Sequence, residues 1–436
     1  HLHTSRMYLC FYTYAMYVLS AAASWEASGL ISETDMSTSY RALFSARGTR
    51  AFALAGLLAR LPLPMTGIGI ITLLSRTHGS YALAGAVSAT FVLAYALLSP
   101  PISARVDRYG QARVLPAATA LSALGMLALV ASTHWHAPDW SLFVWAALAG
   151  TMPSMSAMVR ARWTAMFRGQ PHLQTAYSLE TVLDEVTFIG GPPVSVGLSV
   201  VAFPQAGLLL AALLLILGVF ALVVQRSTEP PPSSDARSHG NGSVLRFSRV
   251  RLLTGLMVAM GVIVGTVDIA SVALAAHLGR PAAASLALSA YAAGSCAAGL
   301  LFGAVAWRIP LHRLLLFGGI ATAATTSPLL LAGSIPALSA ALLLAGAFFA
   351  PTMIVAMSLV ERLVPAARLT EGMTWLLAGL NIGVAMGAAI AGQVVDGQGA
   401  RAGFAVALAG GAAVLLLAGI AHHRLRASSV NTDAAA

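Results

Sequence analysis

The sequence contains few charged residues for its length. Only 9% of its 436 residues are charged, and all 25 basic residues are arginine, with no lysine. Soluble globular domains average about 25% charged residues. This shortage excludes a soluble protein of this size, which would not stay dispersed. The exclusive use of arginine suggests a GC-rich genome and says nothing about mechanism.

Cysteine is almost absent too. Cys10 and Cys296 lie far apart in apolar stretches, without CxxC or metal-ligand spacing, so we expect neither a disulfide framework nor a metal site. The sequence also lacks a Walker loop and the HExxH and GxSxG signatures, which disfavours ATP-driven transport and hydrolysis. We therefore expect no cofactor and no enzymatic activity.

Long apolar runs fill most of the chain, of which 58% is hydrophobic. A run of about 20 residues crosses about 30 Å of hydrocarbon as a helix, which satisfies its own backbone hydrogen bonds. The fold class predicted is all-α integral membrane, with about twelve helices in the lipid bilayer. The expected spans are 51–74, 81–100, 113–133, 140–160, 182–202, 205–225, 251–276, 283–305, 312–332, 336–358, 373–395 and 402–421.

The longest polar stretch divides these spans into six and six. Its Pro-rich start and its Ser, Gly and Asn residues predict a flexible linker. The expected units are an N-terminal six-helix bundle over 36–225, a cytoplasmic linker over 226–250, a C-terminal six-helix bundle over 251–426 and a disordered tail over 427–436.

The first residues fit this pattern poorly. The chain begins with His, and residues 7–23 form an apolar segment. We interpret residues 1–35 as a non-native or upstream extension. A thirteenth span or a signal-like segment is the alternative.

Arginine is unevenly distributed between the two sides of the expected membrane. The loops on one side, which include the linker, hold most of the arginines, among them Arg160 and Arg162, whereas the opposite loops hold Arg76, Arg280 and Arg401. This asymmetry predicts that the linker and the ends of the core lie on the cytoplasmic side of the membrane. The net charge of +10 is scattered singly and forms no nucleic-acid patch.

Motifs recur between the two halves. Glu185 and Gly191 in the fifth span are matched, at the same spacing, by Asn381 and Gly387 in the eleventh. Parallel repeats of this kind suit a transporter whose binding site lies between the halves.

The loop between the second and third spans carries the most informative motif. It reads Ser103-Ala-Arg-Val-Asp107-Arg108-Tyr-Gly110-Gln-Ala-Arg113. The stretch resembles the major facilitator superfamily signature Gly-x-x-x-Asp-Arg-x-Gly-Arg-[Arg/Lys], with Ser103 in place of the first glycine and the basic end displaced to Arg113. The resemblance implies two bundles rocking around a central site. It also implies a loop carboxylate that contacts a helix end in one conformation. A plain positively charged loop is the alternative.

The fifth span contains Gly190-Gly191-Pro192-Pro193, followed by Gly197. This resembles the antiporter motif of the same superfamily and points to bacterial, actinobacterial-type exporters of drugs or small molecules. Glycine permits close helix contact and proline bends a helix. Ordinary helix packing is the alternative, since both residues are common in membrane helices.

Three acids precede this motif. Glu180 and Asp184 share a helix face, and Glu185 is turned about 100° away; Glu180 is expected near the interface. An acid inside the membrane must be paired, protonated or turned toward the bundle interior, and burial favours the neutral form that a proton carrier requires. Asp184 and Glu185 are therefore candidates for proton coupling, with a structural ion pair as the alternative.

Two further charges lie in spans that line the central cavity in the superfamily. Arg60, in the first span, could bind an anionic substrate or neutralise Asp184 or Glu185, and we favour pairing. Asp268, in the seventh span, is a candidate for cation or proton binding, with a structural role equally open. Other candidates for cavity contacts, for which helix packing is favoured, are Tyr291, Trp375, Asn381 and Gln393.

The pattern predicts a monomeric secondary transporter that exports a small molecule in exchange for protons. The alternative is an importer of a metabolite such as a sugar or organic anion, with Arg60 as the anion site. A membrane-embedded enzyme or sensor would need an intramembrane catalytic cluster or an appended soluble domain, and the sequence shows neither.

Overall fold

The computed structural model describes residues 40–433, apart from 79–80, 136, 233–242, 281–282, 306 and 308. The expectations for residues 1–35, including the apolar segment 7–23, lie outside these described residues, as do the middle of the linker and the last three residues of the chain.

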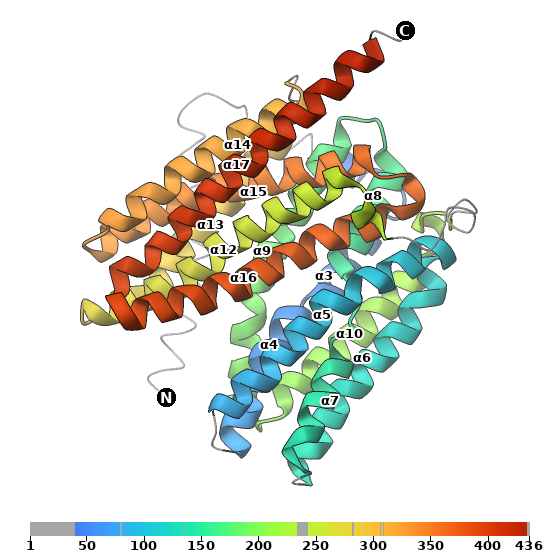
Figure 1. Ribbon diagram of the computed structural model, residues 1–436. Helices are drawn as coiled ribbons and strands as arrows, with labels where there is room; N and C mark the ends of the chain where they lie inside the picture. The colour runs from blue at the N-terminus through green and yellow to red at the C-terminus, as the bar shows by residue number, and fades with distance from the viewer. Residues whose placement is uncertain are drawn as a thin grey trace.

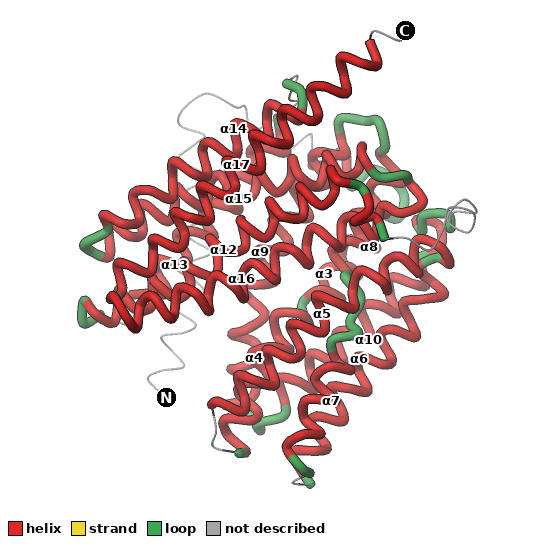
Figure 2. The backbone as a smooth tube through the Cα atoms, viewed as in Figure 1, coloured by secondary structure: helices red, strands yellow, loops and turns green. Residues whose placement is uncertain are grey.

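The described residues form helices and connecting loops, without a strand (Figure 2). The helices of the N-terminal half are α3 (Thr49–Arg60), α4 (Pro62–Thr77), α5 (Tyr81–Tyr109), α6 (Gln111–His134), α7 (Asp139–Ala149), α8 (Met155–Phe167), α9 (His172–Val201) and α10 (Ala206–Val224). Those of the C-terminal half are α12 (Ser248–His277), α13 (Ala284–Ala304), α14 (Leu311–Thr326), α15 (Ile335–Leu363), α16 (Leu369–Gln398) and α17 (Ala400–Asp433).

These helices are consistent with about twelve membrane spans. Ten segments of the described chain are long and apolar enough to cross a membrane. One of them joins α3 and α4, which meet at Leu61. The two remaining spans are α9, which carries three acids, and the pair α7–α8, which is interrupted at residues 150–154 and carries two arginines. The acids of α9, and the short lengths of α7 and α8 on either side of the interruption, explain why these two spans are not among the ten.

The helices are apolar on nearly all faces, as helix α10 illustrates. Leu215, Val219 and Leu222 are buried against neighbouring helices, whereas Leu217 and Phe220 on the other face are exposed. In lipid both faces are favourable, because the exposed side chains meet hydrocarbon instead of water. Packing between helices therefore depends on shape and on the few polar contacts.

The structure corrects two expectations about charged residues. The fifth span begins at His172, so Glu180 lies within α9 and its side chain is fully buried. Arg160 and Arg162, expected in a cytoplasmic loop, lie in α8 and are also fully buried. The sequence boundaries were set at polar residues. Glu180 is however paired with Arg60 and Arg160 with Asp184, and Arg162 donates to backbone carbonyls, so the helices continue through these residues.

The two bundles lie closest at one end and spread apart toward the other (Figure 1). The close end holds the C-terminus of α5, the start of α9, the end of α13 and the start of α16. The described parts of the linker, η1 (Arg226–Thr228) and η2 (Val244–Arg246), also lie there. We call it the linker end.

Candidate functional site: a central cavity between the two halves

Helices α9 and α13 carry a series of contacts between the halves. At the linker end, Thr175 Oγ1 donates a hydrogen bond of 2.7 Å to the carbonyl of Gly303. Midway along the helices, Ser295 Oγ donates to Glu185 Oε1 at 2.9 Å. Among the described residues, the part of α9 after Glu185 makes no hydrogen bond to the other half. Residues of both helices beyond this point line a cavity instead.

Helices α5 and α16 make the second contact between the halves. Asp107 accepts hydrogen bonds from the backbone N–H groups of Thr370 (3.2 Å) and Glu371 (2.8 Å), in the first turn of α16. One turn further, Thr374 Oγ1 donates to Ser103 Oγ at 2.8 Å. A carboxylate is favourable at a helix N-terminus because the first N–H groups have no partner within the helix. The contact has the geometry that the loop motif implies.

The other motif residues are placed around this contact. Gly110 has a φ of +90°, in the left-handed region that favours glycine. The Ala112 N–H, at the start of α6, donates to Glu229 Oε1 of the linker at 2.8 Å. Arg108 lies over a neighbouring tyrosine ring, and Arg113 is exposed. The loop therefore joins α5, α6 and the start of the linker.

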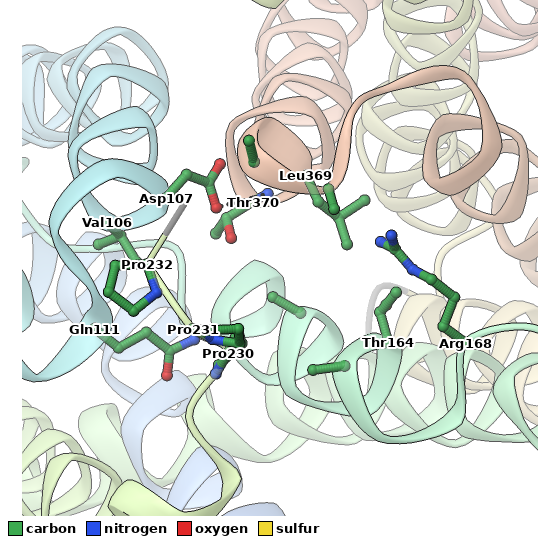
Figure 3. Close-up of a pocket in the computed structure, with 14 residues that line it drawn as sticks. Val106, Asp107, Gln111, Thr164, Arg168, Pro230, Pro231, Pro232, Leu369 and Thr370 are labelled. Carbon is green, nitrogen blue, oxygen red and sulfur yellow. Dashed lines mark hydrogen bonds between the residues drawn. The ribbon is translucent and has the colours of Figure 1, made fainter. Parts of the chain in front are cut away.

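A cavity of about 390 Å³ lies beside this contact and is shown in Figure 3. Asp107 and Thr370 approach each other at one side of it, and Pro230–Pro232 of the linker lie at another. Arg168 lies on its wall and forms an ion pair of 3.4 Å with Glu361 of the opposite half. Both halves and the linker thus meet at the closed end.

The central cavity has a volume of about 370 Å³ and begins where the contacts between α9 and α13 end. Its walls are mostly apolar and come from both halves. The repeat-related residues Glu185 and Asn381 both line it. Its polar lining consists of Tyr95, Ser156, Thr181, Asp184, Glu185, Asp268, Tyr291 and Asn381.

Asp184 belongs to a paired charge network within the N-terminal half. Arg60 Nη1 donates to Asp184 Oδ1 at 3.1 Å, and Arg160 Nη2 donates to Asp184 Oδ2 at 2.8 Å. Ser156 also donates to Asp184. The predicted pairing of Arg60 with Asp184 is therefore present in the structure, whereas Glu185 is not its partner. Asp184 lies at the cavity wall with its charge already compensated.

Glu180 completes this network away from the cavity. It forms an ion pair with Arg60 and accepts a hydrogen bond of 2.8 Å from Trp163 Nε1. The network thus contains two arginines and two carboxylates, all on α3, α8 and α9. Sequence reasoning missed Arg160, although its spacing of four from Ser156 places both on one face of α8. A buried set of balanced charges is the arrangement expected in a low-dielectric interior.

Glu185 and Asp268 differ from Asp184, because no basic side chain in the described part of the chain lines the cavity beside them. Glu185 comes from α9 and Asp268 from α12, so the two halves each contribute one carboxyl group. The hydrogen bond to Glu185 comes from Ser295, a residue that the sequence did not single out. Asp268 is exposed in the cavity wall, and the structure gives its side chain no partner among the described residues.

The four other candidates have different surroundings. Tyr291 and Asn381 line the cavity, and Asn381 Nδ2 donates to the Leu377 carbonyl of its own helix at 3.0 Å. Trp375 Nε1 instead donates to Ser243 Oγ of the linker at 3.1 Å. Gln393 lies further along α16 and does not line the cavity.

The Gly-Pro motif lies inside α9, on the side that packs against α4. A Cβ atom on Gly191 would lie 2.9 Å from Pro64 Cγ and 3.3 Å from Met65 Cγ. Pro192 is within the helix, and Gly197 is half-buried one to two turns further on. Gly191 therefore allows a close approach between the first and fifth spans.

The chain was compared with protein-family models and with curated proteins. The family model of the Major Facilitator Superfamily matches residues 52–279 and 251–435, which together cover most of the chain. The chain belongs to the major facilitator superfamily. It is a multi-pass membrane protein of a transporter family. No curated protein matches it at the sequence level.

Several solved major facilitator structures share this fold. A bacterial homologue of the iron transporter ferroportin, in an outward-facing state, superposes with a TM-score of 0.70 and 18% identity, covering 88% of this chain and 100% of its own. The human organic anion transporter MFSD10 gives 0.65 and 16%, covering 86% and 100%. The E. coli fucose:proton symporter gives 0.62 and 17%, covering 85% and 98%. At these identities the likeness concerns the fold alone.

Proposed function

We propose that this major facilitator protein exports a small molecule across the bacterial cytoplasmic membrane in exchange for protons. The observation that carries the proposal is the central cavity. Glu185 lines it from the N-terminal half and Asp268 from the C-terminal half, and no basic side chain among the described residues lines it with them. A carboxyl group in such a place can be neutralised by a proton or by a cationic ligand, and the two compete. That competition is what exchange requires.

The surroundings favour these two groups over Asp184 as proton carriers. The titratable side chains in the cavity wall are Tyr95, Asp184, Glu185, Asp268 and Tyr291. Asp184 is bonded to two arginines, which compensate its charge. Glu185 accepts only a hydroxyl hydrogen bond, from Ser295. Asp268 and Glu185 are therefore assigned to proton exchange, and Asp184 to structure.

The conformation fits one step of alternating access. If the arginine-rich linker end is cytoplasmic, the contacts of Asp107 with α16 and of α9 with α13 close the cavity on the cytoplasmic side. In the cycle these contacts must break as the halves rock, and the cavity then opens to the cytoplasm. The structure is on this view an outward-facing state, in which protons enter and the exported molecule leaves.

The arginine network argues against the import of an organic anion through Arg60. Arg60 is buried, donates to Glu180 and Asp184, and also donates to the carbonyl of Gly56. Its guanidinium has little capacity left for a ligand. Import of a neutral metabolite remains the competing function, because the cavity also offers the Asn381 amide and the Ser156 hydroxyl.

Everted membrane vesicles test the proposal. Vesicles containing the protein are energised to acidify their interior, which an acridine dye reports, and one compound is then added: tetraphenylphosphonium, tetraphenylborate or fucose. Export in exchange for protons predicts that at least one compound releases protons from the vesicle interior. Vesicles with the Glu185→Gln/Asp268→Asn variant should show no release. Uptake that is independent of the proton gradient would contradict the proposal.

A further inference from the structure

The charge balance of the central cavity indicates which substrates fit it. Arg60 and Arg160 are bonded to Asp184, which lines the cavity. Glu185 and Asp268 therefore contribute negative charge that no cavity residue compensates. An anion placed between them would be repelled at low dielectric, whereas a cation would restore neutrality.

Tyr291 provides a second observation, independent of the acids. It is 8% exposed and lines the cavity from α13, and the structure gives its hydroxyl no hydrogen-bond partner among the described residues. Glu185 and Asp268 line the same cavity. A buried tyrosine normally satisfies its hydroxyl. The unused group therefore points to a ligand.

The rest of the wall indicates the shape of that ligand. Phe349 lies 6.0 Å from Tyr291, measured between ring centroids, and Phe188, Val264, Leu288 and Met353 add apolar surface. Aromatic faces attract cations, and methionine adapts to ligands of differing outline. The volume of about 370 Å³ suits a small organic molecule.

We propose that the central cavity binds an organic cation with an apolar body, whose charged nitrogen or phosphorus lies between Asp268 and Glu185 beside Tyr291. The proposal rests on the proposed function, since it names the substrate class of the same cavity. A divalent metal ion is a poorer fit: the described residues contain no group of three or more His, Cys, Asp or Glu side chains suited to hold one, and such ions need several oxygen or nitrogen ligands.

The test uses two ligands of the same shape and opposite charge. The purified full chain is titrated with tetraphenylphosphonium and, separately, with tetraphenylborate by isothermal calorimetry in detergent. The cation should bind, and the affinity for the anion should be lower by about tenfold or more. Equal binding of the two ions would overturn the proposal, and so would displacement of the bound cation by an equal concentration of Mn²⁺. This comparison needs no variant and so does not depend on folding.

Variants then locate the site. Asp268→Asn and Glu185→Gln should each weaken cation binding about tenfold, and Tyr291→Phe should weaken it less because the ring remains. The matched control is Asp396→Asn, on the exposed outer part of α16, which should bind as the wild type does. Folding of each variant is checked by gel filtration and thermal unfolding. Unchanged binding by a folded double variant, Glu185→Gln/Asp268→Asn, would overturn the assignment.

The outcomes separate this proposal from the proposed function. If tetraphenylphosphonium binds with the expected charge preference and releases no protons from everted vesicles, the cation site stands and the proton exchange is wrong. If protons are released by fucose or tetraphenylborate and the cation does not bind, the exchange stands and the cation site is wrong.

Discussion

Ser295 of α13 donates a hydrogen bond to Glu185 of α9, and Glu185 lines the central cavity. Toward the linker end the two halves are in contact, and on the other side of the pair the cavity begins. A carboxyl group proposed to take up a proton or a cation is thus also part of the closed interface. Occupancy of the cavity and closure of the linker end are therefore physically linked.

Removing this hydrogen bond should favour the open linker end. Ser295→Ala removes the donor and should weaken the closed state by about 1 kcal/mol, about a fivefold change in the ratio of states. Spin labels at the exposed residues Arg105 and Arg362, one in each half at the linker end, would report a larger fraction of long distances. Ser358→Ala, which removes a bond within α15, is the control. An unchanged distance distribution in Ser295→Ala would contradict the link.

Asp107 should stabilise the same closed state through the N-terminus of α16. Asp107→Asn removes the negative charge at that helix end and should cost the closed state up to about 2 kcal/mol. The same pair of spin labels should show opening, and transport should slow. Asp139→Asn, which changes an acid in the first turn of α7 within one half, should leave the distances unchanged. If both variants behave alike, the predicted switch role of Asp107 is wrong.

Arg60 should contribute to the stability of the folded protein and should have little influence on whether a cationic or an anionic ligand binds. Arg60→Ala removes a charged partner from the buried carboxylates of Glu180 and Asp184. The free energy of unfolding should therefore fall by about 3–5 kcal/mol. Thermal unfolding followed by gel filtration would measure the loss, with the exposed Arg280→Ala as control. A stable Arg60→Ala protein that loses binding of an organic anion would instead support an anion site and the import alternative.

The sequence predicted this fold more fully than it predicted the site. The length of an apolar run predicts a membrane helix, and the repeat-related residues Glu185 and Asn381 line one cavity. The expected spans ended at Arg160 and began after Glu180, because a polar residue in an apolar run is interpreted as a boundary when its partner is unknown, whereas the helices continue through both. The partner of each of these residues lies on another helix. A single sequence does not indicate which residues far apart along the chain come into contact.

The same limit applies to Ser295. Serine is common in membrane helices, and nothing in its neighbours marks it as the partner of Glu185. Only the crossing of α9 and α13 brings the two together. Asp107 was predictable because its loop motif is specific, whereas the helix end that it contacts was identified by the structure.

The Gly-Pro motif allows a comparison between two adjacent glycines. A Cβ on Gly191 would press on Pro64 and Met65, whereas a Cβ on Gly190 would have no atom within 4 Å. Gly191→Ala should therefore destabilise the protein by about 1–3 kcal/mol, and Gly190→Ala should leave it unchanged or stabilise it by up to about 1 kcal/mol. Thermal unfolding of the two variants is the measurement. Equal stabilities would show that this contact does not limit helix approach.

The account depends most on the exchange of protons for a cation at Glu185 and Asp268. Its most direct measurement is the release of protons when tetraphenylphosphonium binds to the purified protein in weakly buffered detergent, followed with a pH indicator. Because a cation binds best to ionised carboxyl groups, binding should release protons from the wild type and none from the Glu185→Gln/Asp268→Asn variant, and it should weaken as the pH is lowered. Cation binding to the wild type without any release of protons would contradict the account.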